Sequence, residues 1–308
     1  MSVVRTYDFV QLDVFTRTPL QGNPLAIFPD AREMSAHEMQ ALAKEMNLSE
    51  TTFIIPRDAA TEAEEGKKVR IFTVAEELPF AGHPTLGTAL YLHASQSANN
   101  QSGSNEILLD LAVGKIPVQI DQDPKNATDR VNGSAFGEMR QRDPEFGRIL
   151  ARDDVARTLR IDADEIAPEW PSQVVSTGLP FAVVPLRSSK ILAKLKPGFS
   201  AEELLQGTGA KFLYFLSIER SEDRLEARAR MFFYGGEDPA TGSAAGCAAS
   251  WMAKHGIMQS DERVLIRQGV EMNRPSEIFV RAGREGEQVS NVRVGGYAVE
   301  VLRGTVTL

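Results

Sequence analysis

Apolar residues recur along this chain in two patterns, one typical of strands and one typical of helices. Residues 7–15, 25–28, 51–55 and 69–74 are short alternating, apolar or β-branched runs, which predicts strands. Ser35 with Glu38 three residues later forms a capping box before a segment whose apolar residues recur at helical spacing. Ser200 with Glu203 gives the same helix-start signal. The patterns predict a mixed α/β chain.

A strand, a Pro/Gly turn and the start of a small-residue helix occur twice, 160 positions apart. The first copy runs from Arg70 to His83 and the second from Arg230 to Ser243, without a gap. The duplication predicts two similar lobes, with a cleft where the equivalent turns meet. The copies differ in residues that can do chemistry. His83 aligns with Ser243, and Leu78 aligns with Asp238. The identical pairs are Arg70/Arg230, Phe72/Phe232, Glu77/Glu237, Pro79/Pro239 and Gly82/Gly242.

Each copy leads into a helix rich in Ala, Gly and Thr, at residues 84–93 and 243–255. Small residues on every side indicate close packing all round, so we expect each lobe to be a curved, mostly antiparallel sheet or barrel around one central helix. The polar segment 95–105 predicts a surface loop. We place the N-terminal lobe at 1–125 and the C-terminal lobe at 126–295, with the linker at 121–126. The strand at 296–308 can complete the first lobe.

Composition narrows the class of protein. Of the 308 residues, 42% are hydrophobic and 25% charged, and Lys+Arg 34 against Asp+Glu 42 gives a net charge of −8. An acidic chain without a basic run lacks the electrostatic footprint of nucleic-acid binding. We expect neither a membrane span nor a signal peptide, and hence a cytoplasmic protein. The single cysteine and four scattered histidines give no disulfide and no metal-ligand spacing. Since nucleotide-binding motifs are also missing, we expect no metal and no cofactor.

Two candidate catalytic residues lie in the first lobe. Glu50 stands at a helix-to-strand junction beside Leu48 and Phe53, where apolar walls would raise its pKa and let it both take and give a proton. The alternative is a solvated turn glutamate. Gly82 and His83 precede Pro84 at a helix start, where free N–H groups favour anions. His83 can bind a carboxylate or relay a proton, or it can merely cap the helix.

The motif Asp238-Pro239-Ala240-Thr241-Gly242-Ser243 is the most specific in the chain. Asp238 can accept a hydrogen bond from a substrate hydroxyl or amine, while Ser243 and the Gly242 N–H can bind a carboxylate. The alternative is an ordinary helix-start signal. Cys247, among alanines one turn into the helix, is expected to be a small buried hydrophobe. Two helix N-termini facing one cleft would favour an anion, so we expect a small carboxylate substrate.

The chain resembles the PhzF-like family of phenazine-biosynthesis proteins over nearly its whole length, and the matching elements occur in order. The resemblance implies the diaminopimelate-epimerase fold, with two similar lobes and the active site between them. The elements that carry it are Gly22-Asn23-Pro24, Asn47-Leu48-Ser49-Glu50-Thr51, Pro79-Phe80-Ala81-Gly82-His83-Pro84-Thr85, Asp238-Pro239-Ala240-Thr241-Gly242-Ser243-Ala244 and Gly295-Gly296.

The resemblance also implies roles for the candidate residues. In the family, a glutamate matching Glu50 moves a proton between carbons of a dihydro-hydroxyanthranilate. His83 and Asp238 match the family's other catalytic residues. Gly82 matches a backbone donor, and Gly242 with Ser243 matches the pair that binds the substrate carboxylate. The resemblance further implies a homodimer.

The leading interpretation is a cofactor-independent isomerase that moves a proton on a small carboxylate. Relatives on this fold that epimerise amino acids use two thiols, which one cysteine cannot supply. Two other interpretations remain at this point. One is a non-catalytic small-molecule-binding protein on the same scaffold. The other is a hydrolase with Ser243 as nucleophile, although no nucleophile elbow is present.

Overall fold

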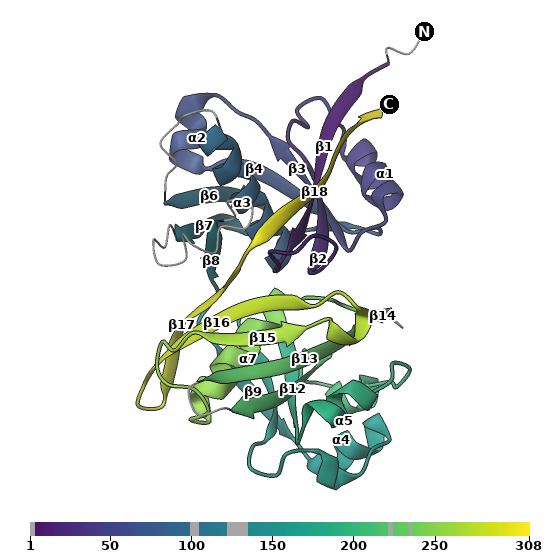
Figure 1. The fold of residues 1–308 in the computed structure, drawn as a ribbon, viewed down its shortest axis with the longest axis vertical. Coiled ribbons are helices and arrows are strands. Elements are labelled where there is room, and N and C mark those ends of the chain that lie inside the picture. The colour runs from purple at the N-terminus through teal and green to yellow at the C-terminus, as the bar shows by residue number, and fades with distance from the viewer. Residues whose placement is uncertain (1–3, 99–104, 122–134, 221–223, 234–235) are drawn as a thin grey trace. The chain divides into compact units, whose positions relative to one another are not determined.

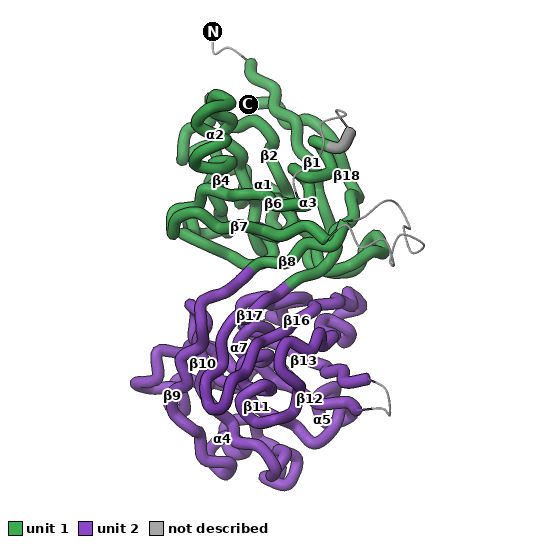
Figure 2. The backbone as a smooth tube through the Cα atoms, turned by 90° about the vertical axis from the view of Figure 1, so that its left-hand side faces the viewer, with its two compact units in different colours: residues 1–139, 295–308 green, residues 140–294 purple. Residues whose placement is uncertain are grey.

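The structure is a computed structural model of the chain (Figure 1). It describes residues 4–98, 105–121, 135–220, 224–233 and 236–308. The chain divides into two compact units, one made of residues 1–139 and 295–308 and the other of residues 140–294 (Figure 2). Within the described ranges, no helix has the length and apolar character needed to cross a membrane.

Unit 1 is a mostly antiparallel sheet that packs around helix α3. The helix packs against β1, β2, β3, β6 and β7. The strand that comes last in the sequence, β18, pairs antiparallel with β1, so that β1 lies between β18 and β2. The elements are β1 (Thr6–Val14), β2 (Asn23–Phe28), α1 (Ala36–Met46), β3 (Glu50–Ile55), α2 (Ala59–Glu65), β4 (Lys67–Phe72), β5 (Glu77–Leu78), α3 (Gly82–Ala98), β6 (Glu106–Leu111), β7 (Gly114–Asp121), β8 (Phe136–Arg140) and β18 (Ala298–Thr307).

Unit 2 surrounds helix α7 in the same way. The helix contacts β10, β11, β12 and β16, and all its residues from Ala244 to Ala253 are buried. The elements are β9 (Glu145–Leu150), α4 (Arg152–Leu159), η2 (Ala163–Glu165), β10 (Ser172–Ser176), β11 (Pro180–Leu186), α5 (Ser189–Lys194), α6 (Glu202–Leu205), β12 (Leu213–Arg220), β13 (Leu225–Phe233), β14 (Gly236–Glu237), α7 (Gly242–Lys254), β15 (Val264–Gln268), η3 (Val270–Met272), β16 (Ser276–Glu285) and β17 (Gln288–Gly296).

Strand pairing follows the same order in both units. In unit 1, β1–β2 is antiparallel, β2–β3 parallel, β3–β4 and β4–β5 antiparallel, β4–β6 parallel and β6–β7 antiparallel. In unit 2 the pairs β10–β11, β11–β12, β12–β13, β13–β14, β13–β15 and β15–β16 repeat that series step for step. The fold class predicted from the duplication, two α/β units each with a sheet around a central helix, is confirmed.

The identical Arg and Glu of the two copies form the same contact in each unit. In unit 1, Arg70 donates from Nε and Nη2 to the two carboxylate oxygens of Glu77, at 2.7 and 2.6 Å. In unit 2, Arg230 binds Glu237 with the same atoms, both at 2.8 Å. Each pair joins a long strand to the short strand of the following turn. We call these pairs the Arg–Glu forks; a fork of this kind fixes two planar groups in one orientation.

Aromatic rings fill the core of unit 1 under α1. Phe28 and Phe53 stack with their ring centroids 4.9 Å apart, and Phe72 meets Phe53 edge-on at 5.5 Å.

The predicted capping box of α1 is present, since Ser35 accepts from the Glu38 N–H and Glu38 accepts from the Ser35 N–H.

Two local predictions, the end of the helix after His83 and the helix start at Ser200, were wrong. The helix expected to end at His93 continues to Ala98, so the first part of the predicted loop at 95–105 is helical. Ser200 is not an N-cap: α6 is one short turn whose N-cap is Ala201, and Ser200 accepts only from the Glu202 N–H at 3.4 Å. Residues 99–104 of the loop and 122–126 of the predicted linker lie outside the described residues.

Candidate active site

Glu50 and His83 meet in unit 1. The distance from His83 Nδ1 to Glu50 Oε2 is 3.5 Å, and the two side chains are 6% and 17% exposed. Glu50 is the first residue of β3, and His83 is the second residue of α3. The interpretation of Glu50 as a solvated turn glutamate is wrong, because the side chain is largely buried.

The histidine is neutral at physiological pH. Burial lowers the pKa of His83 to about 3, and its interaction with the backbone of Pro24 only partly opposes this. Its contact with Glu50 is therefore one between a carboxyl group and a neutral imidazole, although the geometry alone would also allow an ion pair. Nε2 of His83 is buried and has no hydrogen-bond partner among the described residues. A neutral imidazole can relay a proton by accepting it at one ring nitrogen and releasing another from the second nitrogen, so that its net charge does not change.

The Gly-Asn-Pro turn brings the Pro24 backbone to His83. Pro24 lies at the start of β2, which pairs in parallel with β3 so that Leu25 is opposite Glu50. Gly22 has a φ of +69°, and an added Cβ would collide with the Val14 carbonyl oxygen. The turn is therefore closed to other residues at Gly22. The short Gly-Asn-Pro motif thus has a physical cause next to the site.

Asp238 is held in unit 2 at the start of the turn before α7. Its carboxylate oxygen Oδ2 accepts a hydrogen bond from the Thr241 hydroxyl at 2.6 Å, and its N–H donates to the Met231 carbonyl at 3.0 Å. Gly242 and Ser243 are the first two residues of α7, and Ser243 is half-buried. No side chain caps this helix end, which leaves first-turn N–H groups able to bind an anion.

Sequence reasoning missed two residues that contact the Asp238 turn. Gln268, at the end of β15, donates to the Asp238 carbonyl at 2.8 Å, and Gln141 donates to the Gly242 carbonyl at 3.0 Å. Both are far from the motif in sequence, and neither lies in a recognisable pattern. The signal in the sequence was a polar residue, Gln268, on the same face of the alternating strand as Val264 and Ile266.

The six predicted site residues thus fall into two groups. Glu50, Gly82 and His83 belong to unit 1, and Asp238, Gly242 and Ser243 belong to unit 2. Cys247 lies on α7 and is fully buried, and burial raises the pKa of its thiol to about 11. Its Sγ lies 3.5 Å from the Thr177 hydroxyl. The prediction that it is a small buried residue is confirmed.

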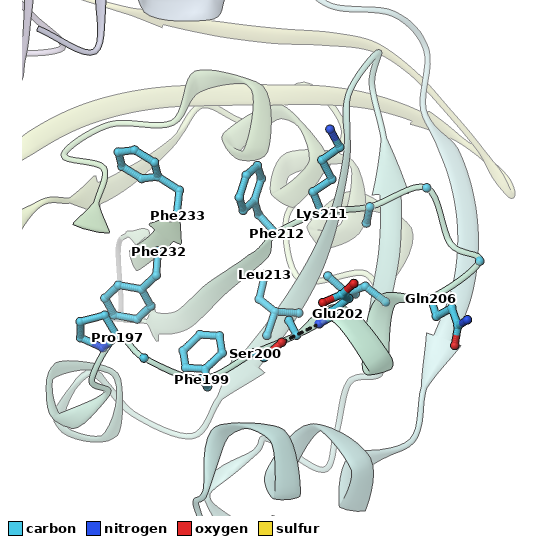
Figure 3. A pocket seen from close by; sticks show the side chains of 16 residues that line it. Pro197, Phe199, Ser200, Glu202, Gln206, Lys211, Phe212, Leu213, Phe232 and Phe233 are labelled. Atoms are coloured by element: carbon cyan, nitrogen blue, oxygen red, sulfur yellow. Dashed lines mark hydrogen bonds between the residues drawn. The ribbon is translucent and has the colours of Figure 1, made fainter. Parts of the chain in front are cut away.

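A separate hollow in unit 2 contains none of these residues. It has a volume of about 700 Å³ and is lined by residues 197–202, 205–207 and 209–213 together with Phe232 and Phe233 (Figure 3). Phe199 and Phe232 form an aromatic wall with their centroids 5.9 Å apart. Its polar residues Ser200, Glu202 and Lys211 are exposed, so they do not form a buried polar site.

Comparison with known proteins places the chain. The model of the family described as phenazine biosynthesis-like protein, PhzC-PhzF, matches residues 12–304. The trans-2,3-dihydro-3-hydroxyanthranilate isomerase of Pseudomonas chlororaphis is 35% identical over 307 residues, covering 98% of this chain and 100% of the relative. That relative's activity favours an enzyme over a binding protein or a hydrolase.

Comparison with solved structures supports the same family assignment. A protein of Pseudomonas aeruginosa described as a predicted epimerase is 32% identical with a TM-score of 0.78, covering 97% of this chain and 99% of its own. A PhzF-family phenazine biosynthesis protein of Bacillus anthracis, 23% identical with a TM-score of 0.84 over 99% and 100% of the two chains, shares the fold. The chain therefore belongs to the phenazine biosynthesis-like, PhzC-PhzF family and is an isomerase.

Proposed function

We propose that this isomerase moves a proton between two carbons of a small cyclic carboxylate by general acid/base catalysis at Glu50, without a metal or an organic cofactor. The observation that carries the proposal is the buried contact between Glu50 and the neutral His83. A carboxylate among buried groups is a suitable proton carrier, and a neutral imidazole beside it adds no positive charge that would hold it ionised.

In the proposed reaction, the Glu50 carboxylate removes a proton from one carbon and leaves an electron pair conjugated with the substrate's double bonds. The protonated Glu50 then returns a proton to another carbon on the same face. Substrate and product are isomers, so no oxidant, reductant or second substrate is needed. One group that both takes and gives a proton suffices, in agreement with the buried, protonated Cys247 having no part in the step.

The unit 2 residues are proposed to bind the substrate. The first-turn N–H groups of α7 at Gly242, together with the Ser243 hydroxyl, suit a carboxylate. Asp238 accepts a hydrogen bond from a hydroxyl or amine substituent. Gly82 supplies a backbone donor in unit 1. The proposed substrate class is that of trans-2,3-dihydro-3-hydroxyanthranilate, which carries a carboxylate, a hydroxyl and an amine. The relative from Pseudomonas chlororaphis is named as the isomerase of this compound.

The test is isomerisation in heavy water. The purified protein, dialysed against a chelator, is incubated in D₂O with trans-2,3-dihydro-3-hydroxyanthranilate and with a panel of related unsaturated cyclic carboxylates. We expect deuterium at a single carbon of the product, detected by NMR and mass spectrometry, and no change in rate when divalent ions are added back. The proposal is wrong if a substrate is turned over only with an added metal, or if none of the carboxylates is isomerised.

A further inference from the structure

The side chain of Gln268 uses its full hydrogen-bonding capacity on the Asp238 turn. It is fully buried at the end of β15. Its Oε1 accepts from the Tyr214 hydroxyl at 3.0 Å and from the Thr241 N–H at 3.2 Å. Its Nε2 donates to the Asp238 carbonyl at 2.8 Å and to the Thr241 hydroxyl oxygen at 2.9 Å. A primary amide offers two donors and two acceptor positions, so all four are occupied.

These contacts fix the direction of every hydrogen bond. A backbone N–H can only donate, and Tyr214 remains a phenol because burial raises its pKa well above the ordinary value, with Asp238 and Cys247 adding to the shift. The Thr241 N–H therefore identifies Oε1 as the acceptor and sets the orientation of the amide, and the Tyr214 hydroxyl donates to the same oxygen. Nε2 must then donate to the Thr241 oxygen. The Thr241 proton is left to point at Asp238 Oδ2, 2.6 Å away.

The first copy of the repeat lacks these groups. At the offset of 160, Leu78 stands in place of Asp238 and Ala81 in place of Thr241. The Arg–Glu fork and the strand pairing are nevertheless the same in both units. The shared frame therefore folds without a hydroxyl at this place. The threonine and its amide partner occur only where the turn carries an acid.

We propose that Gln268 and Thr241 are positioning residues that hold the Asp238 carboxylate in one orientation, so that the site selects a substrate with an N–H or O–H donor opposite it. We call Gln268, Thr241 and Tyr214 the Asp238 anchor. The inference deepens the proposed function and rests on it for the identity of the reaction. A carboxylate oriented before binding loses less freedom when the substrate arrives. The anchor acts through Asp238 and does not itself touch the substrate.

The sharpest test is a pair of substitutions at one position. Thr241→Val removes the hydroxyl and keeps the shape, whereas Thr241→Ser keeps the hydroxyl. With trans-2,3-dihydro-3-hydroxyanthranilate as probe, we expect Thr241→Val to lower kcat/KM by about 10- to 100-fold and Thr241→Ser to stay within a few-fold of wild type. Tyr214→Phe, which loses only the outermost donor, should have a smaller effect than Thr241→Val.

A matched control separates positioning from stability. Ser250 is fully buried on α7, and its hydroxyl donates to the Gly246 carbonyl at 2.9 Å without contacting the anchor. Ser250→Ala should lower the melting temperature and leave kcat and KM unchanged. If Thr241→Val behaves in the same way, with lower stability and normal kinetics, the positioning role is refuted. Gln268→Met is informative if it folds, and the Thr241 pair decides the question if it does not.

A second readout does not depend on activity. Crystal structures of wild type and Thr241→Val, without substrate, would show the Asp238 side chain. We expect one conformer in wild type and a rotated or divided carboxylate in the variant; an identical carboxylate overturns the inference. If wild type turns over none of the carboxylates while its Asp238 is fixed and the variant's is not, the proposed function fails and the anchor stands.

Discussion

The two Arg–Glu forks are equal in geometry and unequal in surroundings. The side chains of Arg230 and Glu237 are 6% and 12% exposed, whereas those of Arg70 and Glu77 are 25% and 39% exposed. Nη1 of Arg230 also donates to the carbonyls of Leu192 and Leu195 at 3.0 and 2.8 Å, at the end of α5. The fork of unit 2 is thus built into the core, while that of unit 1 remains near solvent.

The chemistry of the two turns differs in a parallel way. In unit 1, Glu50 and His83 contact each other, and Nε2 of His83 is unsatisfied among the described residues. In unit 2, Asp238 is held by a saturated hydrogen-bond network through Thr241 and Gln268. A group that moves a proton needs room to change its partners, whereas a group that orients a substrate gains from being fixed. Under the proposed function, the duplicated frame supports two different tasks.

The largest expected effect tests the proposed proton transfer in unit 1. Glu50→Gln keeps the shape and removes the base, so kcat should fall by about 10²–10⁴. Asp238→Asn is the matched change in unit 2, and we expect it to raise KM more than it lowers kcat, because it impairs orientation of the substrate. Steady-state kinetics of both variants measures the split. Near-normal kcat in a folded Glu50→Gln variant would reject Glu50 as the proton carrier.

The next effect compares the forks by stability. Arg230→Met leaves the buried Glu237 without its guanidinium partner and removes the donor to the carbonyls at the end of α5, which should cost about 3–5 kcal/mol of unfolding free energy. Arg70→Met, in the more exposed fork, should cost about 0–1 kcal/mol. Urea unfolding of both variants gives the difference. Equal losses would mean that burial does not distinguish the forks.

A third effect is the pH dependence that His83 gives to stability. Its pKa is about 3 in the folded protein and about 6.5 when unfolded. A lowered pKa means that the unfolded state binds the proton more tightly, so stability is full above pH 6.5 and is lost as pH falls toward 3. Between pH 7 and pH 5 this loss amounts to about 2 kcal/mol.

The measurement is urea unfolding of wild type and His83→Gln at both pH values. The variant should lose about 2 kcal/mol less than wild type on going from pH 7 to pH 5. His37→Gln, at an exposed position of α1, is the control and should follow wild type. Parallel curves for wild type and His83→Gln would show that the buried imidazole is not linked to folding.

The smallest effect concerns Cys247 in unit 2. Cys247→Ala leaves a small cavity in a fully buried position and should cost about 1 kcal/mol of stability, with most of the activity retained. Thermal unfolding and kcat of the variant check both parts. Loss of turnover in a well-folded variant would give the thiol a role in the reaction that its burial and raised pKa argue against.

Much of the fold could be predicted because the same strand, turn and helix start occur twice in the sequence. The offset of 160 aligns Arg70 with Arg230 and Gly82 with Gly242, and the structure repeats the strand pairing around these positions. Capping at Ser35 was also readable, since it depends on residues only three apart. The helix predicted to begin after Ser200 was wrong, because the capping pattern there precedes only the single turn of α6.

The candidate site was only partly readable. Local motifs singled out Glu50, His83 and Asp238 as candidates. The structure brings Glu50 and His83 together, and the catalytic roles of all three residues stay a prediction. Gln268 was not identified, because its importance comes from where β15 places it relative to a turn 30 residues earlier. The shared cleft expected from the two turns stays a prediction. Periodicity reports local structure, whereas partners across a sheet depend on the tertiary fold.

The pairing of β1 with β18 sets an order for folding during synthesis. Unit 2 is a continuous stretch of chain, residues 140–294, and has all its strands once that stretch has left the ribosome. Unit 1 lacks one of the two neighbours of β1 until residues 298–307 emerge. Contacts between segments this far apart in sequence form slowly, and an unpaired strand edge invites association with other chains. The second half of the chain can therefore finish folding first, while the half that carries Glu50 and His83 waits with an open edge for the strand that closes it.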